Sequence, residues 1–145
     1  MQERGMHEGW PRTVAVIGAG TMGLGVAECF AAAGMEVRIT DATPQMTREA
    51  KERLAERARG HAEAGLLSAE AAERAASVET ADDAQAASRG AELVFEAAPE
   101  DLDLKHELLA ACSRAAPGDA VIVSNTSSLP IDELAEAVEG PGRFL

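Results

Sequence analysis

Three glycines in the pattern Gly-x-Gly-x-x-Gly constrain the fold of this chain more than any other feature. The pattern is formed by Gly18, Gly20 and Gly23. It directly follows the apolar run Thr13–Ile17, whose β-branched residues predict a strand buried on both faces. From 22 to 33 apolar residues recur at helical spacing, and Gly34 ends the segment. The chain therefore begins its fold with a strand, a glycine turn and a helix.

The rest of the chain alternates between predicted strands and predicted helices. Further strands are expected at 36–40, 77–80, 91–96 and 120–123. Helices are expected at 45–64, 68–76, 101–115 and 130–138, and the first two of these form a helical hairpin. On the helix at 101–115, the predicted apolar stripe is Leu104, Leu108, Ala111, Cys112 and Ala115. This alternation predicts an α/β fold with a parallel, doubly wound sheet of the Rossmann type.

Length and composition are those of one globular domain. The chain has 145 residues, of which 46% are hydrophobic and 26% charged, so a disordered tail and a disulfide-stapled mini-protein are both excluded. We expect a leader at 1–12 and one domain at 13–145. At 143–145 a sixth strand is expected to begin, which would leave the apolar edge of the fifth strand uncovered. We therefore expect a homo-oligomer or an aggregation-prone monomer.

The net charge and the two cysteines limit the kinds of partner and site that we expect. A net charge of −12 repels phosphate backbones and anionic lipid, so neither nucleic acid nor a membrane surface is an expected partner. No stretch approaches the roughly 18 apolar residues of a membrane span, and the first residues lack a signal-peptide core, so we expect a cytoplasmic protein. Cys29 and Cys112 lie far apart without Cys or His neighbours, so we expect no disulfide and no metal site, and predict two buried thiols.

The glycine pattern lies where a dinucleotide-binding fingerprint must lie, between a buried strand and a helix. Gly18 permits a tight turn, Gly20 lets the backbone approach a pyrophosphate, and Gly23 lets helix and strand pack closely. The helix N-terminus offers free N–H groups and the positive end of the helix dipole. The alternative is a glycine turn that serves only packing. The strand before the turn, the helix after it and a suitably spaced acidic residue all favour dinucleotide binding instead.

That acidic residue is Asp41, which ends the second predicted strand roughly 20 residues beyond the first glycine. We expect its carboxylate to hold the adenosine ribose hydroxyls. The same carboxylate would face the 2′-phosphate of NADP, and a like-charge pair at about 4 Å costs roughly 1 to 4 kcal/mol, so NAD is favoured by about tenfold or more. Arg38 shares a strand face with Thr40 rather than with Asp41 and does not relieve this repulsion. As an alternative, Asp41 caps the helix that begins near Pro44.

Polar segments follow the fourth and fifth predicted strands, at 96–105 and 124–128. Because the carboxyl ends of parallel strands lie at one edge of the sheet, both segments are expected to share a site with the glycine turn and Asp41. They lie where the nicotinamide of a dinucleotide would be placed.

Three motifs resemble, in order, those of the L-3-hydroxyacyl-CoA dehydrogenases and their 3-hydroxybutyryl-CoA relatives. They are Gly-Ala-Gly-Thr-Met-Gly-Leu-Gly at 18–25, Glu-Ala-Ala-Pro-Glu-Asp-Leu-Asp-Leu-Lys at 96–105 and Ser-Asn-Thr-Ser-Ser-Leu at 124–129. The resemblance, which runs from Thr13 to Leu145, implies NAD-dependent oxidation of a 3-hydroxyacyl thioester in which Ser127 hydrogen-bonds the 3-oxygen of the substrate. It also implies the NAD contacts Gly18, Gly20, Thr21, Met22, Gly23, Asp41, Ala98, Pro99, Glu100, Lys105 and Asn125.

Several of these residues have plainer alternatives. Ser127 could cap a helix, Lys105 could be a solvated charge, and Glu100 could be a charge at a helix N-terminus. The three histidines are expected on the surface and are assigned no role; they are His7, His61 and His106. For the chain as a whole, the alternative is a non-catalytic dinucleotide-binding module.

The sequence also departs from the family pattern in two places. The family's catalytic His follows soon after the Arg-Phe segment found here at 143–144, so we expect that His, its orienting Glu and an all-helical domain to be absent. The chain would then be the cofactor-binding part of a longer enzyme, inactive alone. At the tip of the hairpin, Ala64–Leu67 stand where the resemblance implies basic residues near CoA. The thioester is therefore carried by CoA or, alternatively, by an acyl carrier protein, with Arg53, Arg57 and Arg59 as substitutes for the tip charge.

Overall fold

The computed structural model describes residues 9–145, so most of the expected leader, including His7, lies outside the described residues. A sheet of five parallel strands forms the centre, in the order β3-β2-β1-β4-β5. Its strands are β1 (Thr13–Ile17), β2 (Glu36–Thr40), β3 (Glu79–Thr80), β4 (Leu93–Glu96) and β5 (Val121–Ser124). The helices are α1 (Thr21–Ala32), α2 (Pro44–Glu63), α3 (Ala69–Ala76), α4 (Ala84–Ser88), α5 (Leu102–Ala115) and α6 (Ile131–Ala135), followed by a 3-10 turn, η1 (Pro141–Arg143).

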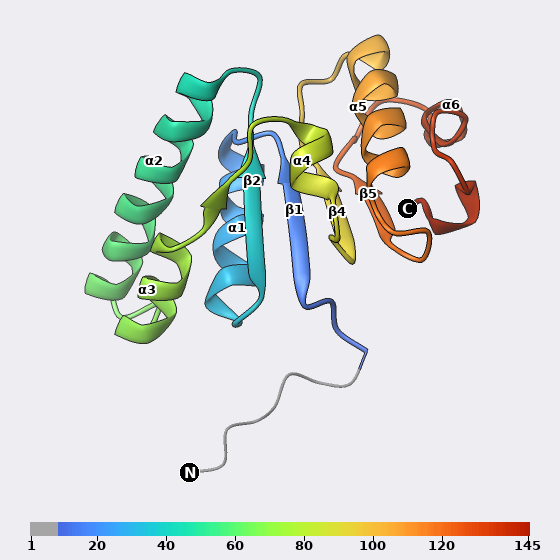
Figure 1. Cartoon of the computed structure of the whole chain (residues 1–145). Helices are drawn as coiled ribbons and strands as arrows, with labels where there is room; N and C mark the ends of the chain where they lie inside the picture. Colours follow the sequence, from blue (N-terminus) through green and yellow to red (C-terminus); the bar gives the residue numbers. More distant parts are fainter. Residues whose placement is uncertain (1–8) are drawn as a thin grey trace.

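The two faces of the sheet carry separate cores, which confirms the doubly wound α/β architecture. Strand β1 is buried on both sides: Val14 and Val16 pack with α1, α2 and α3, whereas Ala15 and Ile17 pack with α4, α5 and α6. Figure 1 shows α2 and α3 at one side of the sheet and α5 and α6 beyond its other side. Because every strand is parallel, all carboxyl ends lie at one edge, next to the turns that open α1, α2, α5 and the segment before α6.

Local sequence accounts for the helix boundaries. Four helices begin at a residue whose side chain accepts a hydrogen bond from the first turn: Thr43, Ser68, Asp83 and Asp101. Pro44 occupies the first position of α2, where its missing N–H costs nothing. Gly34, with φ of 97°, follows the end of α1 and returns the chain to β2. Within residues 9–145, no helix combines the length and the apolarity that crossing a membrane requires.

Some elements differ from the sequence-based expectation. Helix α4 was not expected, β3 has only two residues, and α6 is shorter than the predicted 130–138. The predicted stripe of α5 is confirmed at Cys112 but not at its other members. The buried side chains are Lys105, Leu109, Cys112 and Ser113, while Leu104, Leu108, Ala111 and Ala115 are half-buried. The prediction assumed that only apolar residues face the core, whereas two polar residues with partners occupy this face.

Two predictions about exposure also fail. Cys112 is buried, but Cys29 is exposed because it lies one position beyond the buried stripe of α1. The edge of β5 is not fully open: Phe144 forms a parallel bridge with Ile122, and the Ser124 N–H donates to the Leu145 carbonyl at 3.0 Å. The final residues therefore cover part of the edge that was expected to be bare.

Candidate functional site at the carboxyl edge of the sheet

The glycine turn between β1 and α1 requires glycine at two positions. Gly18 has φ of 101°, and a Cβ there would lie 2.6 Å from the Ala97 carbonyl oxygen. A Cβ on Gly23 would collide with the Gly18 carbonyl oxygen. At Gly18 the turn thus packs against the segment after β4, and at Gly23 helix α1 packs against the turn, too closely in both places for a side chain.

The N-terminus of α1 is open to an anion. Its capping residue is Gly20, so no side chain caps the first turn, and that turn holds no acidic residue. By contrast, the N–H groups that open α2, α3 and α5 are bound by capping side chains. A Cβ on Gly20 would meet no atom within 4 Å. Free N–H groups facing open space fit the pyrophosphate of a dinucleotide.

Asp41 lies directly beside this turn. Its Oδ2 accepts a hydrogen bond from the Ala19 N–H at 2.9 Å and its Oδ1 accepts one from the Ala42 N–H at 2.7 Å. The cap of α2 is Thr43, which accepts from the Met46 N–H at 3.2 Å. The alternative that Asp41 caps α2 is therefore wrong, and its carboxylate faces the glycine turn instead.

A cleft of about 320 Å³ opens at Asp41. It is bounded by the ends of β1 and β2, the turn before α4, the segment after β4 and two leucines of α5, and its lining residues include Gly18, Asp41, Asp83, Pro99, Leu104 and Leu108. Apolar walls with a carboxylate at the mouth suit a nucleoside, whose base is flat and whose ribose carries hydroxyls. Leu104 and Leu108, expected in the core, line this cleft, and Leu108 also packs against the core on its face of the sheet.

Beyond the cleft, a buried ion pair holds the segment after β4. The Lys105 Nζ lies 2.7 and 3.0 Å from the two carboxylate oxygens of Glu96 and donates to the Ala98 carbonyl at 2.9 Å. Both side chains are at most 1% exposed. The alternative of a solvated lysine is therefore wrong. Glu96 also accepts a hydrogen bond from the Ser124 hydroxyl at 2.5 Å, which ties the ends of β4 and β5 together.

Glu100 forms a second link between these two segments. Its Oε2 accepts from the Ser128 hydroxyl at 2.6 Å and from the Thr126 hydroxyl at 2.8 Å, and its Oε1 lies 3.3 Å from the Lys105 Nζ. The hydrogen bond from Ser128, followed by that from Thr126, lowers the pKa of Glu100 from its usual value of 4.5 to about 2. Asp101, not Glu100, caps α5, so Glu100 is more than a charge at a helix end.

Ser127 differs from the other hydroxyls of its run. Ser124, Thr126 and Ser128 all donate to carboxylates, whereas Ser127 is exposed and its hydroxyl has no hydrogen-bond partner within residues 9–145. Helix α6 begins after Pro130 without a side-chain cap, so the helix-cap alternative for Ser127 is wrong. The run thus presents one free hydroxyl at the edge that also holds the glycine turn.

The other predicted contact residues lie around these groups. Thr21 and Met22 are exposed at the start of α1, Ala98 and Pro99 line the cleft, and the Asn125 N–H donates to the Glu96 carbonyl at 2.8 Å. Their contacts with a cofactor, like that of Lys105, stay predictions. Sequence reasoning missed Glu96 as a site residue, although a carboxylate that ends an apolar strand is a sign of a paired buried charge.

Two of the three histidines lie within the described residues, and both have a partner. His61 is not simply a surface residue, because its Nδ1 lies 2.6 Å from Oε1 of Glu28, a carboxylate of α1 that is only 4% exposed. Arg57 donates to the other oxygen of Glu28 at 2.6 Å. His106 places its Nε2 2.7 Å from the Glu133 carbonyl oxygen.

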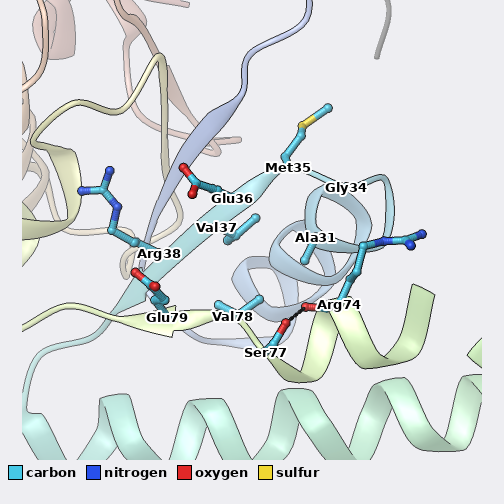
Figure 2. Close-up of a pocket in the computed structure, with 10 residues that line it drawn as sticks. All are labelled: Ala31, Gly34, Met35, Glu36, Val37, Arg38, Arg74, Ser77, Val78 and Glu79. Atoms are coloured by element: carbon cyan, nitrogen blue, oxygen red, sulfur yellow. Dashed lines mark hydrogen bonds between the residues drawn. The ribbon is translucent and has the colours of Figure 1, made fainter. Parts of the chain in front are cut away.

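A larger cavity, of about 520 Å³, lies at the opposite edge of the sheet. Figure 2 shows its lining, which includes Met35 and Glu36 where β2 begins and Glu79 where β3 begins. Its two arginines are engaged: Arg74 donates twice to the Ala32 carbonyl, at 3.1 and 2.6 Å, and Arg38 donates to the Arg89 carbonyl at 2.6 Å. The size of this cavity therefore does not make it the candidate site.

Comparison with known proteins agrees with the geometry. Residues 13–145 match the family model described as 3-hydroxyacyl-CoA dehydrogenase, NAD binding domain. The chain belongs to this family. The cofactor of the domain is thus NAD, as predicted. A 3-hydroxyadipyl-CoA dehydrogenase of Escherichia coli is 35% identical over 91% of this chain and 28% of its own length. An L-carnitine dehydrogenase of Streptomyces griseus is 34% identical over 92% of this chain and 39% of its own length.

Solved structures show the same fold. FadB2 of Mycobacterium tuberculosis superposes with a TM-score of 0.86 at 34% identity, covering 93% of this chain and 48% of that one. The chain spans less than half the length of each of these relatives. The likeness therefore establishes the fold and the family of this NAD-binding domain.

Proposed function

We propose that this domain holds NAD along the carboxyl edge of its sheet and serves the oxidation of a 3-hydroxyacyl thioester to the 3-oxoacyl thioester. The adenosine half would lie in the cleft at Asp41, the pyrophosphate at the N-terminus of α1, and the nicotinamide half near Ala98, Glu100 and Ser127. The observation that carries the proposal is the free hydroxyl of Ser127 at the same edge as the glycine turn.

Each group has a physical role in this proposal. NAD, when bound, supplies the ring that accepts hydride from C3 of the substrate. Ser127 donates a hydrogen bond to the 3-oxygen and so orients the carbon that reacts. The buried pair of Glu96 and Lys105 fixes the segment at 98–100, and Glu100 holds the run around Ser127 through two hydroxyls. The carboxylate of Asp41 favours NAD over NADP by like-charge repulsion.

Oxidation also needs a group that takes the hydroxyl proton. Glu100 is a poor base because its pKa is about 2. The imidazoles of His61 and His106 lie against Glu28 and the Glu133 carbonyl. We therefore propose that the proton acceptor comes from outside residues 9–145 and that this chain alone binds NAD without turning over substrate.

The acyl carrier is proposed to be CoA. The 3-hydroxyadipyl-CoA dehydrogenase relative is named for a CoA thioester, and no structural feature favours a carrier protein. Two of the arginines considered as substitutes for the tip charge are engaged: Arg57 pairs with Glu28, and Arg53 donates to the Ala19 carbonyl at 2.9 Å. Arg59, the third of them, is exposed and makes no hydrogen bond or ion pair within residues 9–145.

Strand β5 lies at the outer side of the sheet, and apolar side chains are exposed beside it. Val121 and Leu145 are 38% and 69% exposed beside β5, so we propose that the chain forms a homo-oligomer there. Light scattering on concentrated protein tests this, and a species of single-chain mass at all concentrations contradicts it.

Calorimetric titration of the chain with NAD and NADP tests the function. NAD is expected to bind about tenfold tighter than NADP or more, and Asp41→Asn, which keeps size but removes charge, is expected to abolish most of that difference. A folded chain that binds neither nucleotide at millimolar concentration overturns the proposal. NADH production from 3-hydroxybutyryl-CoA or from L-carnitine by this chain alone would contradict the proposed need for an outside base.

A further inference from the structure

Helix α2 presents a line of basic side chains to α1 and its glycine turn. Arg53, Arg57 and His61 are spaced by four residues and so lie on one face of the helix. Arg57 and His61 both contact Glu28 near the middle of α1. Arg53 contacts the turn itself: its Nη2 donates to the carbonyl of Ala19 at 2.9 Å.

Ala19 is held at both of its backbone polar groups. Its N–H donates to Asp41 at 2.9 Å, its carbonyl accepts from Arg53 at 2.9 Å, and the residue is 1% exposed. The peptide that joins Ala19 to Gly20 is planar and trans, so its N–H and its C=O point in opposite directions. By holding the carbonyl, Arg53 therefore fixes the direction of the Gly20 N–H.

That direction matters for an anion at the start of α1. If this peptide rotated, a carbonyl oxygen would replace an N–H group and would repel a pyrophosphate. Gly20 has no Cβ to resist the rotation, and a Cβ there would meet no atom within 4 Å. The hydrogen bond from Arg53 to the Ala19 carbonyl resists this rotation.

We propose that Arg53 is a positioning residue for NAD, which keeps the Ala19–Gly20 peptide turned so that the Gly20 N–H faces the pyrophosphate. The inference rests on the proposed placement of NAD and adds a residue that the dinucleotide fingerprint does not contain.

The role can be separated from simple stabilisation of α2. The helix is anchored by its buried residues and by the contacts of Arg57 and His61 with Glu28, whereas Arg53 is an exposed residue. Arg59 lies on the same helix, is also exposed, and makes no hydrogen bond or ion pair within the described part of the chain. Arg59→Gln therefore removes the same charge without touching the turn and is the matched control for Arg53→Gln.

The test compares the parent chain, Arg53→Gln, Arg53→Lys and Arg59→Gln by calorimetry with NAD, ADP and adenosine. Arg53→Gln is expected to weaken NAD and ADP by about tenfold, the loss of one charge-assisted hydrogen bond. Adenosine, which has no pyrophosphate, is expected to bind within about twofold of the parent. Arg53→Lys is expected to recover part of the loss, and Arg59→Gln to show none. In the ligand-free chain, the Gly20 amide resonance is expected to shift in Arg53→Gln but not in Arg59→Gln.

The possible failures are distinguishable. Equal NAD binding by the parent and Arg53→Gln overturns the inference alone. Equal losses for adenosine and NAD identify a structural role, and equal losses in Arg53→Gln and Arg59→Gln identify a general charge effect, so both overturn it. A parent chain that binds neither NAD nor ADP overturns the proposed function, and the positioning role falls with it.

Discussion

At the residue scale, two serines of one run have opposite environments. Ser124 donates to the buried Glu96, whereas the Ser127 hydroxyl is free within residues 9–145. Ser124→Ala is expected to lower the free energy of unfolding by about 2 kcal/mol, because a buried carboxylate loses a partner. Ser127→Ala is expected to change it by less than about 0.5 kcal/mol and to leave NAD affinity unchanged.

Urea unfolding of both variants checks this difference. A Ser127→Ala variant as unstable as Ser124→Ala would mean that Ser127 is a structural residue. The proposed role in orienting the substrate would then lose its main support.

The pKa of Glu100 makes a second prediction at this scale. Because its folded pKa of about 2 lies below the usual 4.5, the carboxylate stabilises the fold fully above pH 4.5, and this contribution is lost as the pH falls through 2. Carboxyl-carbon NMR is expected to give a titration midpoint near 2. Ser128→Ala is expected to raise it, since that hydroxyl is the largest cause, and Ser127→Ala is expected to leave it unchanged. A titration midpoint near 4.5 for Glu100 in the parent chain would show that this carboxylate does not hold the hydroxyls of Thr126 and Ser128 in solution.

Residues whose role depends on sequence spacing were predictable, and those whose role depends on distant partners were not. Gly18, Gly23 and Asp41 follow from the strand and helix around them. The burial of Lys105 did not follow, because its partner Glu96 belongs to another element and only the fold brings their charges to 2.7 Å. The hydrogen bond from Arg53 to the Ala19 carbonyl could not be predicted either, because the two residues belong to different elements.

At the element scale, α5 is held to β4 by a charge pair in the core. Replacing Lys105 with Met leaves the Glu96 carboxylate buried without its cation and is expected to cost about 3 to 5 kcal/mol. The double variant with Glu96→Gln is expected to be more stable than Lys105→Met alone, because no charge then remains buried. Chemical denaturation measures both, and a Lys105→Met variant as stable as the parent would contradict the pairing.

The helix faces also predict the reactivity of the two thiols. Burial raises the pKa of the Cys112 thiol to about 11, so little thiolate forms at neutral pH, whereas Cys29 is exposed on α1. A disulfide reagent is expected to modify one thiol quickly in the folded chain and the second only after unfolding. Cys29→Ser is expected to abolish the fast phase. Rapid modification of both thiols would show that α5 packs more loosely than described.

Among the elements, those with strong periodicity or caps were predictable. Strands β1, β2 and β4 and helix α1 follow from apolar patterns. Helices α2 and α3 follow from a composition rich in Ala, Glu and Arg, bounded by Pro44, Gly65 and Ser68. Helix α4 has only five residues, too few to show a helical period, although Asp83 caps it. The face of α5 was predicted wrongly because a lysine paired inside the core breaks the apolar pattern.

At the scale of the whole molecule, the parallel sheet gathers every candidate site residue at one edge. The glycine turn, the cleft at Asp41 and the run around Ser127 come from segments far apart in the sequence, yet each follows the carboxyl end of a strand. This convergence was predictable from topology alone. The larger cavity lies at the amino ends of β2 and β3, so it provides an internal comparison for any binding experiment.

The most direct test of the account is the map of amide chemical shifts when NAD is added to the chain. We predict that NAD changes the chemical shifts of the amides at 20–23, at Asp41, at 98–100 and at 125–127. The amides of 34–37 and 77–79, which lie at the larger cavity, are expected to stay unchanged. Shifts that stop at Asp41 would leave the nicotinamide half, and with it the role of Ser127, without support. Shifts confined to the cavity at the amino ends of β2 and β3 would contradict the placement of NAD altogether.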